Sequence, residues 1–216
     1  MKKYILFDLD GTITNPKEGI TKSIQYALHR MGIEVEDLDS LCKHIGPPLK
    51  YGFMEFWGFN EEEAEHGIDL YREYFSVTGI YQNYEYEGIK ALCESLEKAG
   101  KKLIMATSKP EKFAKLIMEY FRLDSYFYDI CGASMDNKRC KKGDVIRYAL
   151  NKNNITDLDQ VVMVGDRLHD IEGARENKID SIGVLYGFGS REELVKAGAG
   201  KIAETVEDLK TMLLED

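Results

Sequence analysis

The sequence lacks several features that would place it in a specialised class. Its four cysteines include no closely spaced pair of the kind that zinc knuckles and redox motifs need. No stretch reaches the roughly 18 apolar residues of a membrane helix, and the apolar run near the N-terminus stops at Asp8, too soon for a secretion signal. We therefore expect a soluble, cytoplasmic protein with reduced thiols and no membrane partner.

Blocks of a single charge sign are absent as well. The 216 residues include 38 acidic and 29 basic side chains, giving a net charge of −9, and the basic ones are dispersed among the acids. A protein that binds a nucleic-acid duplex usually gathers its positive charge into a patch, so we expect no such partner. An acidic protein that handles an anionic substrate needs local positive charge, which a metal ion and one or two lysines can supply.

What the sequence does contain is an alternation of short apolar runs with amphipathic helical patterns. Strands are expected at residues 4–7, 103–106, 161–164 and 181–185, with a weaker candidate at 128–131. Continuous apolar runs of this length are typical of a parallel sheet that is covered on both faces. The alternation predicts an α/β fold with a Rossmann-like, doubly wound sheet.

One region breaks the alternation. Residues 16–81 contain helical patterns, near 20–31, 36–44, 48–57 and 61–77, and no convincing strand. We therefore expect a helical domain of residues 16–81 inserted after the first strand, while residues 1–15 and 82–216 form the α/β core.

The strongest chemical signal is the segment Phe7-Asp8-Leu9-Asp10-Gly11-Thr12, directly after the first expected strand. Ligands bind at the carboxyl ends of strands in open α/β sheets. Two acids two residues apart can share such a site, because one can attack or bind a metal while the other moves protons. The alternative interpretation is an ordinary acidic turn, in which Gly11 only lets the backbone bend.

Two further signals involve groups that can bind phosphate. Thr107 and Ser108 follow the strand at 103–106, where a hydroxyl and a backbone N–H can hold a phosphate oxygen or cap a helix. Lys142 lies at the start of an expected helix and can neutralise phosphate as a point charge. Taken alone, each motif is explained at least as well by helix capping or by a solvated surface lysine.

A fourth signal repeats the pattern of acids after a buried strand. Asp166 and Asp170 follow the run at 161–164, and their spacing suits neighbours at the start of a helix. Acids are also favoured there by the helix dipole alone. However, all four signals lie near carboxyl ends of expected strands, hence on one sheet edge, and their oxygen ligands indicate a hard cation such as Mg²⁺.

Together these motifs resemble those of the haloacid dehalogenase-like hydrolase superfamily. The resemblance rests on the order Asp8-Leu9-Asp10-Gly11-Thr12, then Thr107, Lys142, and Gly165-Asp166 with Asp170. The helical insert resembles the superfamily's C1-type cap. The segment at 185–194 resembles the bacterial 5′-nucleotidase-like branch, whereas the loop at 44–50 is similar to that of phosphoglycolate phosphatases.

The resemblance implies a Mg²⁺-dependent phosphatase that acts on a small phosphorylated metabolite. Asp8 would be the nucleophile that forms an aspartyl-phosphate, and Asp10 the acid/base that protonates the leaving oxygen and then activates water. The implied binding residues are Thr107, Ser108 and Lys142 for phosphate, Asp8, Asp166, Asp170 and the backbone carbonyl of Asp10 for Mg²⁺, and Gly46 and Pro47 for substrate in the cap loop.

Several alternatives stay open. Nucleoside 5′-monophosphates are the favoured substrates and phosphoglycolate the second, while a sugar phosphomutase would share both acids. A non-enzymatic phospho-acceptor or a dead enzyme scaffold is less consistent with the complete set of acids, and the acid at Asp10 argues against a dehalogenase. Lys109 and Arg167 either contact substrate or pair with surface acids. We expect a monomer or a weak homodimer.

Overall fold

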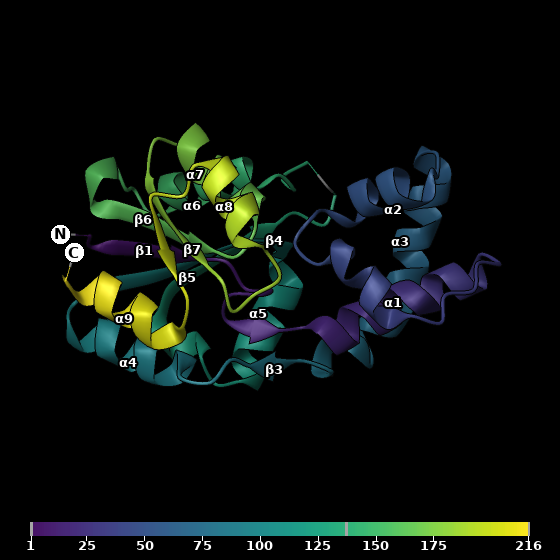
Figure 1. Ribbon diagram of the computed structural model, residues 1–216, viewed down its shortest axis with the longest axis horizontal. Coiled ribbons are helices and arrows are strands. Elements are labelled where there is room, and N and C mark those ends of the chain that lie inside the picture. The colour runs from purple at the N-terminus through teal and green to yellow at the C-terminus, as the bar shows by residue number, and fades with distance from the viewer. Residues whose placement is uncertain (1, 137, 216) are drawn as a thin grey trace. The chain divides into compact units, whose positions relative to one another are not determined.

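The computed structural model describes residues 2–136 and 138–215, which divide into two compact units. The core unit consists of the chain up to Asn15 and from Glu85 onward, and the helical unit is Pro16–Tyr84 (Figure 1). The chain returns to the core three residues later than the boundary of 81 that the sequence suggested. Two short strands, β2 (Thr14–Asn15) and β3 (Tyr84–Glu85), pair where the chain leaves and re-enters the core.

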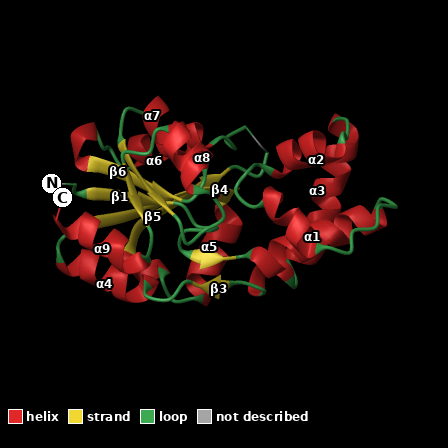
Figure 2. Ribbon diagram, viewed as in Figure 1, coloured by secondary structure: helices red, strands yellow, loops and turns green. Residues whose placement is uncertain are grey.

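The core unit is built on a six-stranded parallel sheet with the order β5-β4-β1-β6-β7-β8 (Figure 2). Its strands are β1 (Tyr4–Phe7), β4 (Lys102–Pro110), β5 (Phe127–Ala133), β6 (Val161–Gly165), β7 (Asp180–Val184) and β8 (Lys201–Ala203). This sheet confirms the Rossmann-like α/β fold expected from the alternating pattern.

β1 lies at the centre of the sheet because its residues can be buried on both faces. Ile5, Leu6 and Phe7 have no exposed surface, as the continuous apolar run predicted. Phe7 is in register with Met105 of β4 on one side and with Val164 of β6 on the other. The residues that follow these three positions therefore emerge at the same edge of the sheet, which is where the sequence motifs lie.

Helices cover both faces of the sheet, as Figure 1 shows. The helices α4 (Ile89–Lys98), α5 (Glu111–Tyr120) and α9 (Val206–Glu215) lie on one face. The other face carries α6 (Lys142–Lys152), α7 (Leu168–Glu176) and α8 (Arg191–Ala197). The apolar stripe of α6, including Val145, Ile146 and Ala149, packs in one cluster with Leu6 and Met163 of the sheet. This layering fixes the first residue of α6 beside the ends of the strands.

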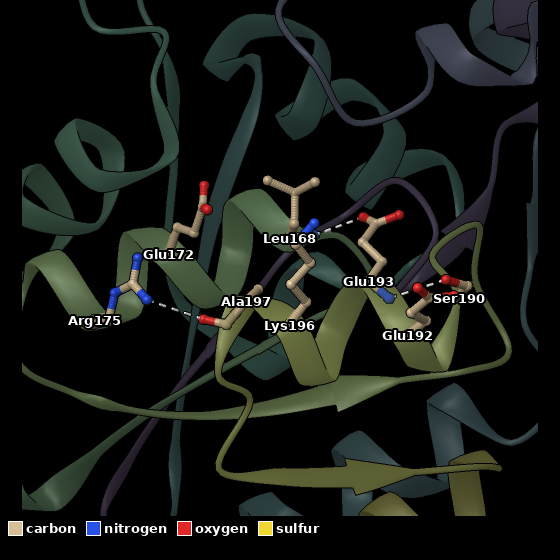
Figure 3. A pocket seen from close by; sticks show the side chains of 8 residues that line it. All are labelled: Leu168, Glu172, Arg175, Ser190, Glu192, Glu193, Lys196 and Ala197. Carbon is tan, nitrogen blue, oxygen red and sulfur yellow. Dashed lines mark hydrogen bonds between the residues drawn. The ribbon is translucent and has the colours of Figure 1, made fainter.

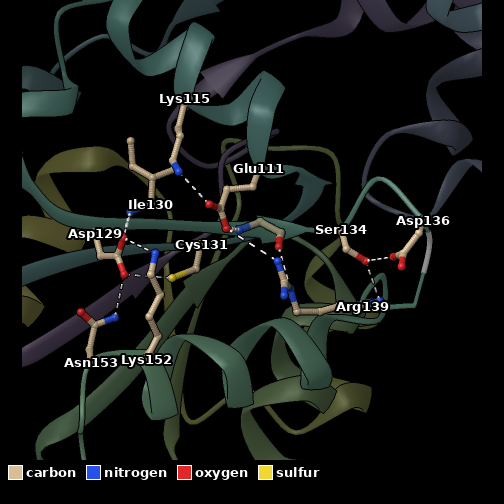
Figure 4. Close-up of polar contacts among 11 residues, drawn as sticks. Glu111, Lys115, Asp129, Ile130, Cys131, Ser134, Asp136, Arg139, Lys152 and Asn153 are labelled. Carbon is tan, nitrogen blue, oxygen red and sulfur yellow. Dashed lines mark hydrogen bonds and ion pairs between the residues drawn. The ribbon is translucent and has the colours of Figure 1, made fainter.

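Side chains form hydrogen bonds with backbone groups of β5, the strand that ends the sheet (Figure 4). The Ile130 N–H donates to the neighbouring Asp129 carboxylate at 2.9 Å, and the Gly132 N–H donates to Glu111 at 3.4 Å. Arg139 Nε in turn donates to the Gly132 carbonyl at 3.0 Å. An uncovered edge strand is a template for pairing with another chain, and these contacts occupy two backbone N–H groups and one carbonyl of β5.

The helical unit contains α1 (Lys17–Arg30), the 3₁₀ helix η1 (Leu38–His44), α2 (Leu49–Trp57), α3 (Glu61–Phe75) and the short 3₁₀ helix η2 (Gly79–Tyr81). The pattern at 36–44 is thus a 3₁₀ rather than an α-helix, and α3 ends two residues before position 77. A capping box between Asn60 and Glu63 begins α3. In the described residues, every helix is too short or too polar to cross a membrane.

Candidate active site

The turn after β1 brings both acids of the first motif to the sheet edge. Asp8 still donates its N–H to Val164 of β6, at 2.9 Å, so it continues the strand. Asp8 and Asp10 are buried, with 4% and 8% of their surface exposed. Gly11 has a φ of +87°, and a Cβ there would lie 2.2 Å from Oδ2 of Asp166. This position needs glycine both for its backbone conformation and for space.

The second pair of acids is held by backbone donors at the end of β6. Asp166 Oδ2 accepts the Phe188 N–H at 2.8 Å, and Thr12 Oγ1 lies 3.5 Å from Oδ1. Asp170, in the first turn of α7, accepts the Arg167 N–H through Oδ2 at 3.1 Å. Asp170 therefore satisfies a free donor at the N-terminus of α7 and leaves Oδ1 facing the site.

Lys142, the first residue of α6, is a buried site residue and not a surface lysine. Its Nζ lies 2.7 Å from Asp8 Oδ1 and 2.8 Å from Asp170 Oδ1, and donates to the Ala106 carbonyl at 3.1 Å. Burial disfavours the charged ammonium, but the carboxylates of Asp170 and Asp8 outweigh that effect and raise the pKa of Lys142 above its ordinary value. The side chain is therefore a permanent positive charge.

Three carboxylates converge at this point in the described residues. Asp8, Asp166 and Asp170 each contribute an oxygen, and these oxygens lie within 4.8 Å of one another. Burial raises the pKa of Asp170 to about 6, with repulsion from Asp8 opposed by Lys142. Burial, followed by repulsion from Asp170 and Asp8, also raises the pKa of Asp166 well above its ordinary value. The single positive charge of Lys142 does not balance the negative charge of three carboxylates.

Two oxygens of this cluster are not fully satisfied by the described part of the protein. Asp8 Oδ1 and Asp170 Oδ1 lie at ion-pair distance from Lys142, but neither contact has hydrogen-bond geometry. Two buried carboxylate oxygens are thus left without a hydrogen bond from any residue that the structure describes. A buried set of oxygen-only donors suits a hard divalent cation, as expected from the sequence.

The side chain of Asp10 lies outside the cluster of Asp8, Asp166 and Asp170 and is paired with a different lysine. Lys109 Nζ lies 2.7 Å from Asp10 Oδ2, and the two side chains are only 5% and 11% exposed. Burial raises the pKa of Asp10 although Lys109 opposes the shift. Among the described residues, nothing donates to Asp10 Oδ1. The sequence interpretations of Lys109 were a substrate contact or a surface ion pair, and the acid that it contacts here is the buried Asp10.

Thr107 and Ser108 lie where β4 departs from regular pairing. Thr107 is in register with Gly132, but the next paired residue is Pro110, so the backbone is irregular between them. Thr107 is buried and Ser108 is half-buried. The Lys109 N–H donates to Thr107 Oγ1 at 3.2 Å, and α5 has no side-chain cap at its N-terminus. Neither hydroxyl therefore caps α5. Thr107 and Ser108 directly follow Ala106, whose carbonyl accepts the hydrogen bond from Lys142.

Arg167 pairs with an acid of α8. Its Nε lies 2.8 Å from Glu193 Oε1, which also accepts the Leu168 N–H at 2.8 Å. Glu193 therefore caps α7 and holds Arg167, as the second sequence interpretation of this arginine suggested. Figure 3 shows the pocket beside this contact, which is lined by Leu168, Glu172, Arg175, Ser190, Glu192, Glu193, Lys196 and Ala197. Asp8, Asp166 and Asp170 do not line this pocket.

Sequence reasoning did not single out a tyrosine pair next to the first motif. Tyr186 donates to the Thr12 carbonyl at 3.2 Å, and its ring lies 5.1 Å from that of Tyr86 in an edge-to-face contact. Burial, followed by Asp166, raises the pKa of both phenols above the ordinary value. Both tyrosines lie in aromatic or glycine-rich segments, but sequence pattern alone does not place them on the carbonyl of Thr12.

Gly46 and Pro47, the expected cap-loop residues, belong to the helical unit. They lie between η1 and α2 and are half-buried. Just before them, His44 is buried and its Nε2 accepts a hydrogen bond from Trp57 at 2.9 Å. The contribution of Gly46 and Pro47 to substrate binding stays a prediction.

Several known proteins are similar to this chain over most of its length. A 5′-nucleotidase of Pseudomonas aeruginosa is 47% identical over 190 residues, covering 88% of this chain and 86% of that protein. A tyrosine-protein kinase, PtkA, of Mycobacterium tuberculosis is 36% identical over 98% of this chain and 72% of its own length. A crystal structure of a predicted phosphatase from Clostridium acetobutylicum covers both chains fully, with 51% identity and a TM-score of 0.98.

The family comparison extends over most of the core and the whole helical unit. Residues 5–184 match the haloacid dehalogenase-like hydrolases, which is the family that the sequence motifs resemble. This match includes Asp8, Lys142 and Asp166. The chain therefore belongs to the haloacid dehalogenase-like hydrolase family, and within it resembles proteins named as phosphatases.

Proposed function

We propose that this protein is a Mg²⁺-dependent phosphatase that hydrolyses small phosphomonoesters, nucleoside 5′-monophosphates first among them, through an aspartyl-phosphate on Asp8. The observation that carries the proposal is the convergence of Asp8, Lys142, Asp166 and Asp170 at one sheet edge. Phosphate-monoester hydrolysis is among the slowest uncatalysed reactions and needs accelerations of up to ~10²¹. Most of that must come from positioning and charge neutralisation.

The negative charge of the three carboxylates favours binding of a divalent cation. Asp8, Asp166 and Asp170 would hold it through side-chain oxygens, and the backbone carbonyl of Asp10 would add a further oxygen ligand. Bound Mg²⁺ would neutralise negative charge on the phosphoryl oxygens. Without a cation, a dianionic substrate would be repelled by this group of acids, which Lys142 alone does not balance.

In the first half-reaction, Asp8 acts as nucleophile. A carboxylate oxygen of Asp8 forms a bond to phosphorus as the bond from phosphorus to the ester oxygen breaks. The electron pair leaves with the ester oxygen, which takes a proton from Asp10. Lys142 stays beside Asp8 and offsets the repulsion between the carboxylate and the phosphoryl group, while the hydroxyls of Thr107 and Ser108 hold phosphoryl oxygens.

In the second half-reaction, Asp10 changes from acid to base. Its carboxylate takes a proton from water as the water oxygen attacks phosphorus. The bond between phosphorus and Asp8 breaks, its electron pair returns to the carboxylate, and phosphate leaves. A positioned acid/base of this kind contributes about 10²–10⁴ in rate. The buried Oδ1 of Asp10, to which none of the described residues donates, supports this role.

Similarity to named relatives guides the substrate proposal. The relative named 5′-nucleotidase, at 47% identity over most of both chains, favours nucleoside 5′-monophosphates. Phosphoglycolate is the second choice, from the resemblance of the loop at 44–50. If Gly46 and Pro47 contribute to that choice, Pro47→Ala will change the ranking of substrates more than the rate with p-nitrophenyl phosphate.

The test is release of inorganic phosphate from a set of phosphomonoesters, with Mg²⁺ and with EDTA. The set includes adenosine, uridine and cytidine 5′-monophosphates, phosphoglycolate and a hexose phosphate. The proposal predicts Mg²⁺-dependent release, highest for a nucleotide, and none from Asp8→Asn. Activity that survives Asp8→Asn, or that is equal in EDTA, would contradict it.

A further inference from the structure

Asp10, the proposed acid/base, forms an ion pair with a second buried lysine, Lys109, to which the sequence motifs gave no role. Lys109 Nζ contacts Asp10 Oδ2 at 2.7 Å, whereas Lys142 contacts Asp8 and Asp170. The site therefore divides its two lysines between its two proposed catalytic carboxylates. Each contact is almost fully shielded from solvent, with side-chain exposures of 11% or less.

The irregular end of β4 places Lys109 beside Asp10. Lys109 lies in the irregular stretch between Thr107 and Pro110, where β4 loses its regular pairing with β5. An irregularity of this kind re-aims a side chain relative to the rest of the strand. The hydrogen bond from the Lys109 N–H to Thr107 Oγ1 stabilises the local turn. The same short segment thus places a proposed phosphate ligand and the partner of Asp10.

The two oxygens of Asp10 have different surroundings. Oδ2 is paired with Lys109, while Oδ1 is buried and accepts no hydrogen bond within the described residues. A carboxylate tied at one oxygen cannot rotate freely, so the other oxygen points in one direction. Catalytic groups must be held within a fraction of an ångström of their working position, which a buried ion pair can do.

We infer that Lys109 is a positioning residue for Asp10: its ammonium fixes Oδ2 and thereby presents Oδ1 to the leaving-group oxygen and afterwards to water. The inference rests on the proposed function. Lys109 takes no part in bond making or breaking in this account. Its removal releases the Asp10 carboxylate and leaves the nucleophile Asp8, with its own lysine, in place.

The test compares substrates that do and do not need a proton on the leaving group. The alkoxide of adenosine 5′-monophosphate leaves poorly without a proton, so Lys109→Met should lower kcat/KM for this ester about 10²-fold. The phenolate of p-nitrophenyl phosphate leaves unaided, so kcat/KM for that ester should fall less than about fivefold. Lys109→Arg keeps a cation beside Asp10 and should recover most of the loss. Lys112→Met, at an exposed position three residues away, is the matched control and should leave both values unchanged.

A double-mutant cycle separates positioning from a general structural effect. If Lys109 acts through Asp10, Lys109→Met should lower kcat for p-nitrophenyl phosphate in the wild-type background, because water activation is impaired, and should not lower it further in Asp10→Asn. The double variant removes both charges of the buried pair. If thermal unfolding shows that Lys109→Met alone folds poorly, Lys109→Arg takes its place in the wild-type background, and a further loss in the double variant relative to Asp10→Asn still overturns the inference.

The outcomes separate the inference from the function on which it rests. An equal loss of kcat/KM on both esters, or a further loss in the Asp10→Asn background, would overturn the positioning role. So would a Lys109→Met variant that behaves like Lys112→Met while the wild type is active and Asp8→Asn is not. A wild-type protein with no Mg²⁺-dependent activity on either ester would instead overturn the proposed function.

Discussion

The Nζ atom of Lys142 lies 2.7 Å from Oδ1 of Asp8, and both side chains are buried, with exposures of 3% and 5%. This contact places a permanent positive charge beside the proposed nucleophile. It also joins the first residue of α6 to the turn after β1, so it supports the local structure of the sheet edge. Substitution of Lys142 should therefore affect both activity and stability.

We expect Lys142→Met to lower the free energy of unfolding by roughly 3–5 kcal/mol in EDTA, because it leaves buried carboxylates without their cation. Added Mg²⁺ should restore part of the loss by binding the same acids. Chemical denaturation with and without Mg²⁺ measures both effects. Lys141→Met, at the exposed neighbouring position, is the control and should change neither. A variant as stable as the wild type in EDTA would contradict the importance of this ion pair.

Gly11→Ala should lower phosphatase activity as well as the free energy of unfolding. A residue with a side chain at positive φ costs about 1–2 kcal/mol, and at Gly11 the new Cβ would also overlap Asp166. Gly198→Ala is a matched control in the same unit, because its φ is +92° and nothing lies within 4 Å of the added Cβ. Both variants should lose stability, but only Gly11→Ala should lose phosphatase activity. Equal activities for the two variants would show that the space around Asp166 is unimportant.

The buried His44 predicts a pH dependence in the helical unit. Burial lowers the pKa of His44 from 6.5 to about 4, with a smaller effect of Lys43. Between these values the unfolded chain binds a proton that the folded chain does not, so stability should fall as the pH drops from about 6.5 towards 4. The full effect is on the order of 3 kcal/mol. Trp57, the single tryptophan, donates to His44 Nε2 and can report the transition by fluorescence.

The control for this titration is the exposed His29, whose side chain is 64% exposed. We expect His44→Phe to flatten the pH dependence of stability between pH 6.5 and 4, while His29→Gln leaves it as in the wild type. A proton resonance of His44 that titrates near pH 6.5 in the folded protein would contradict the buried, neutral state.

The covered edge of β5 makes a prediction about self-association. Glu111→Ala with Arg139→Ala removes the side chains that occupy the Gly132 N–H and carbonyl. The exposed backbone groups should then pair with another copy of the chain, so the average mass should rise with concentration more steeply than for the wild type. Light scattering measures this mass. Arg147→Ala, which breaks only the pair with Asp144 on α6, should leave it unchanged.

Much of the site could be predicted because its residues directly follow strands that the sequence pattern identifies. The apolar runs at 4–7, 103–106 and 161–164 became β1, β4 and β6, and parallel strands bring their carboxyl ends to one edge. Asp8 and Asp166 therefore had to lie close together once the sheet was correct. The strand β8 was missed because its three residues include a lysine and no continuous apolar run.

Other features depend on side-chain reach, which sequence patterns do not encode. Lys109 could have pointed to solvent, and only the irregular end of β4 turns it to Asp10. Lys142 likewise looked like one of two surface lysines beside Lys141, although its stem passes into the core to reach Asp8. The segment at 36–44 has the length of an α-helix, but its turns are 3₁₀, a local choice that amphipathic periodicity does not distinguish.

The most direct test of the central claim is acid quenching of the enzyme during turnover, followed by peptide mass spectrometry. With Mg²⁺ and a nucleoside 5′-monophosphate, the account predicts a phosphoryl group on Asp8, with more of it accumulating in Asp10→Asn if water activation is slowed more than phosphoryl transfer. It predicts no phosphorylated peptide from Asp8→Asn. A phosphoryl group on a different residue during productive turnover, or turnover by Asp8→Asn, would contradict the account.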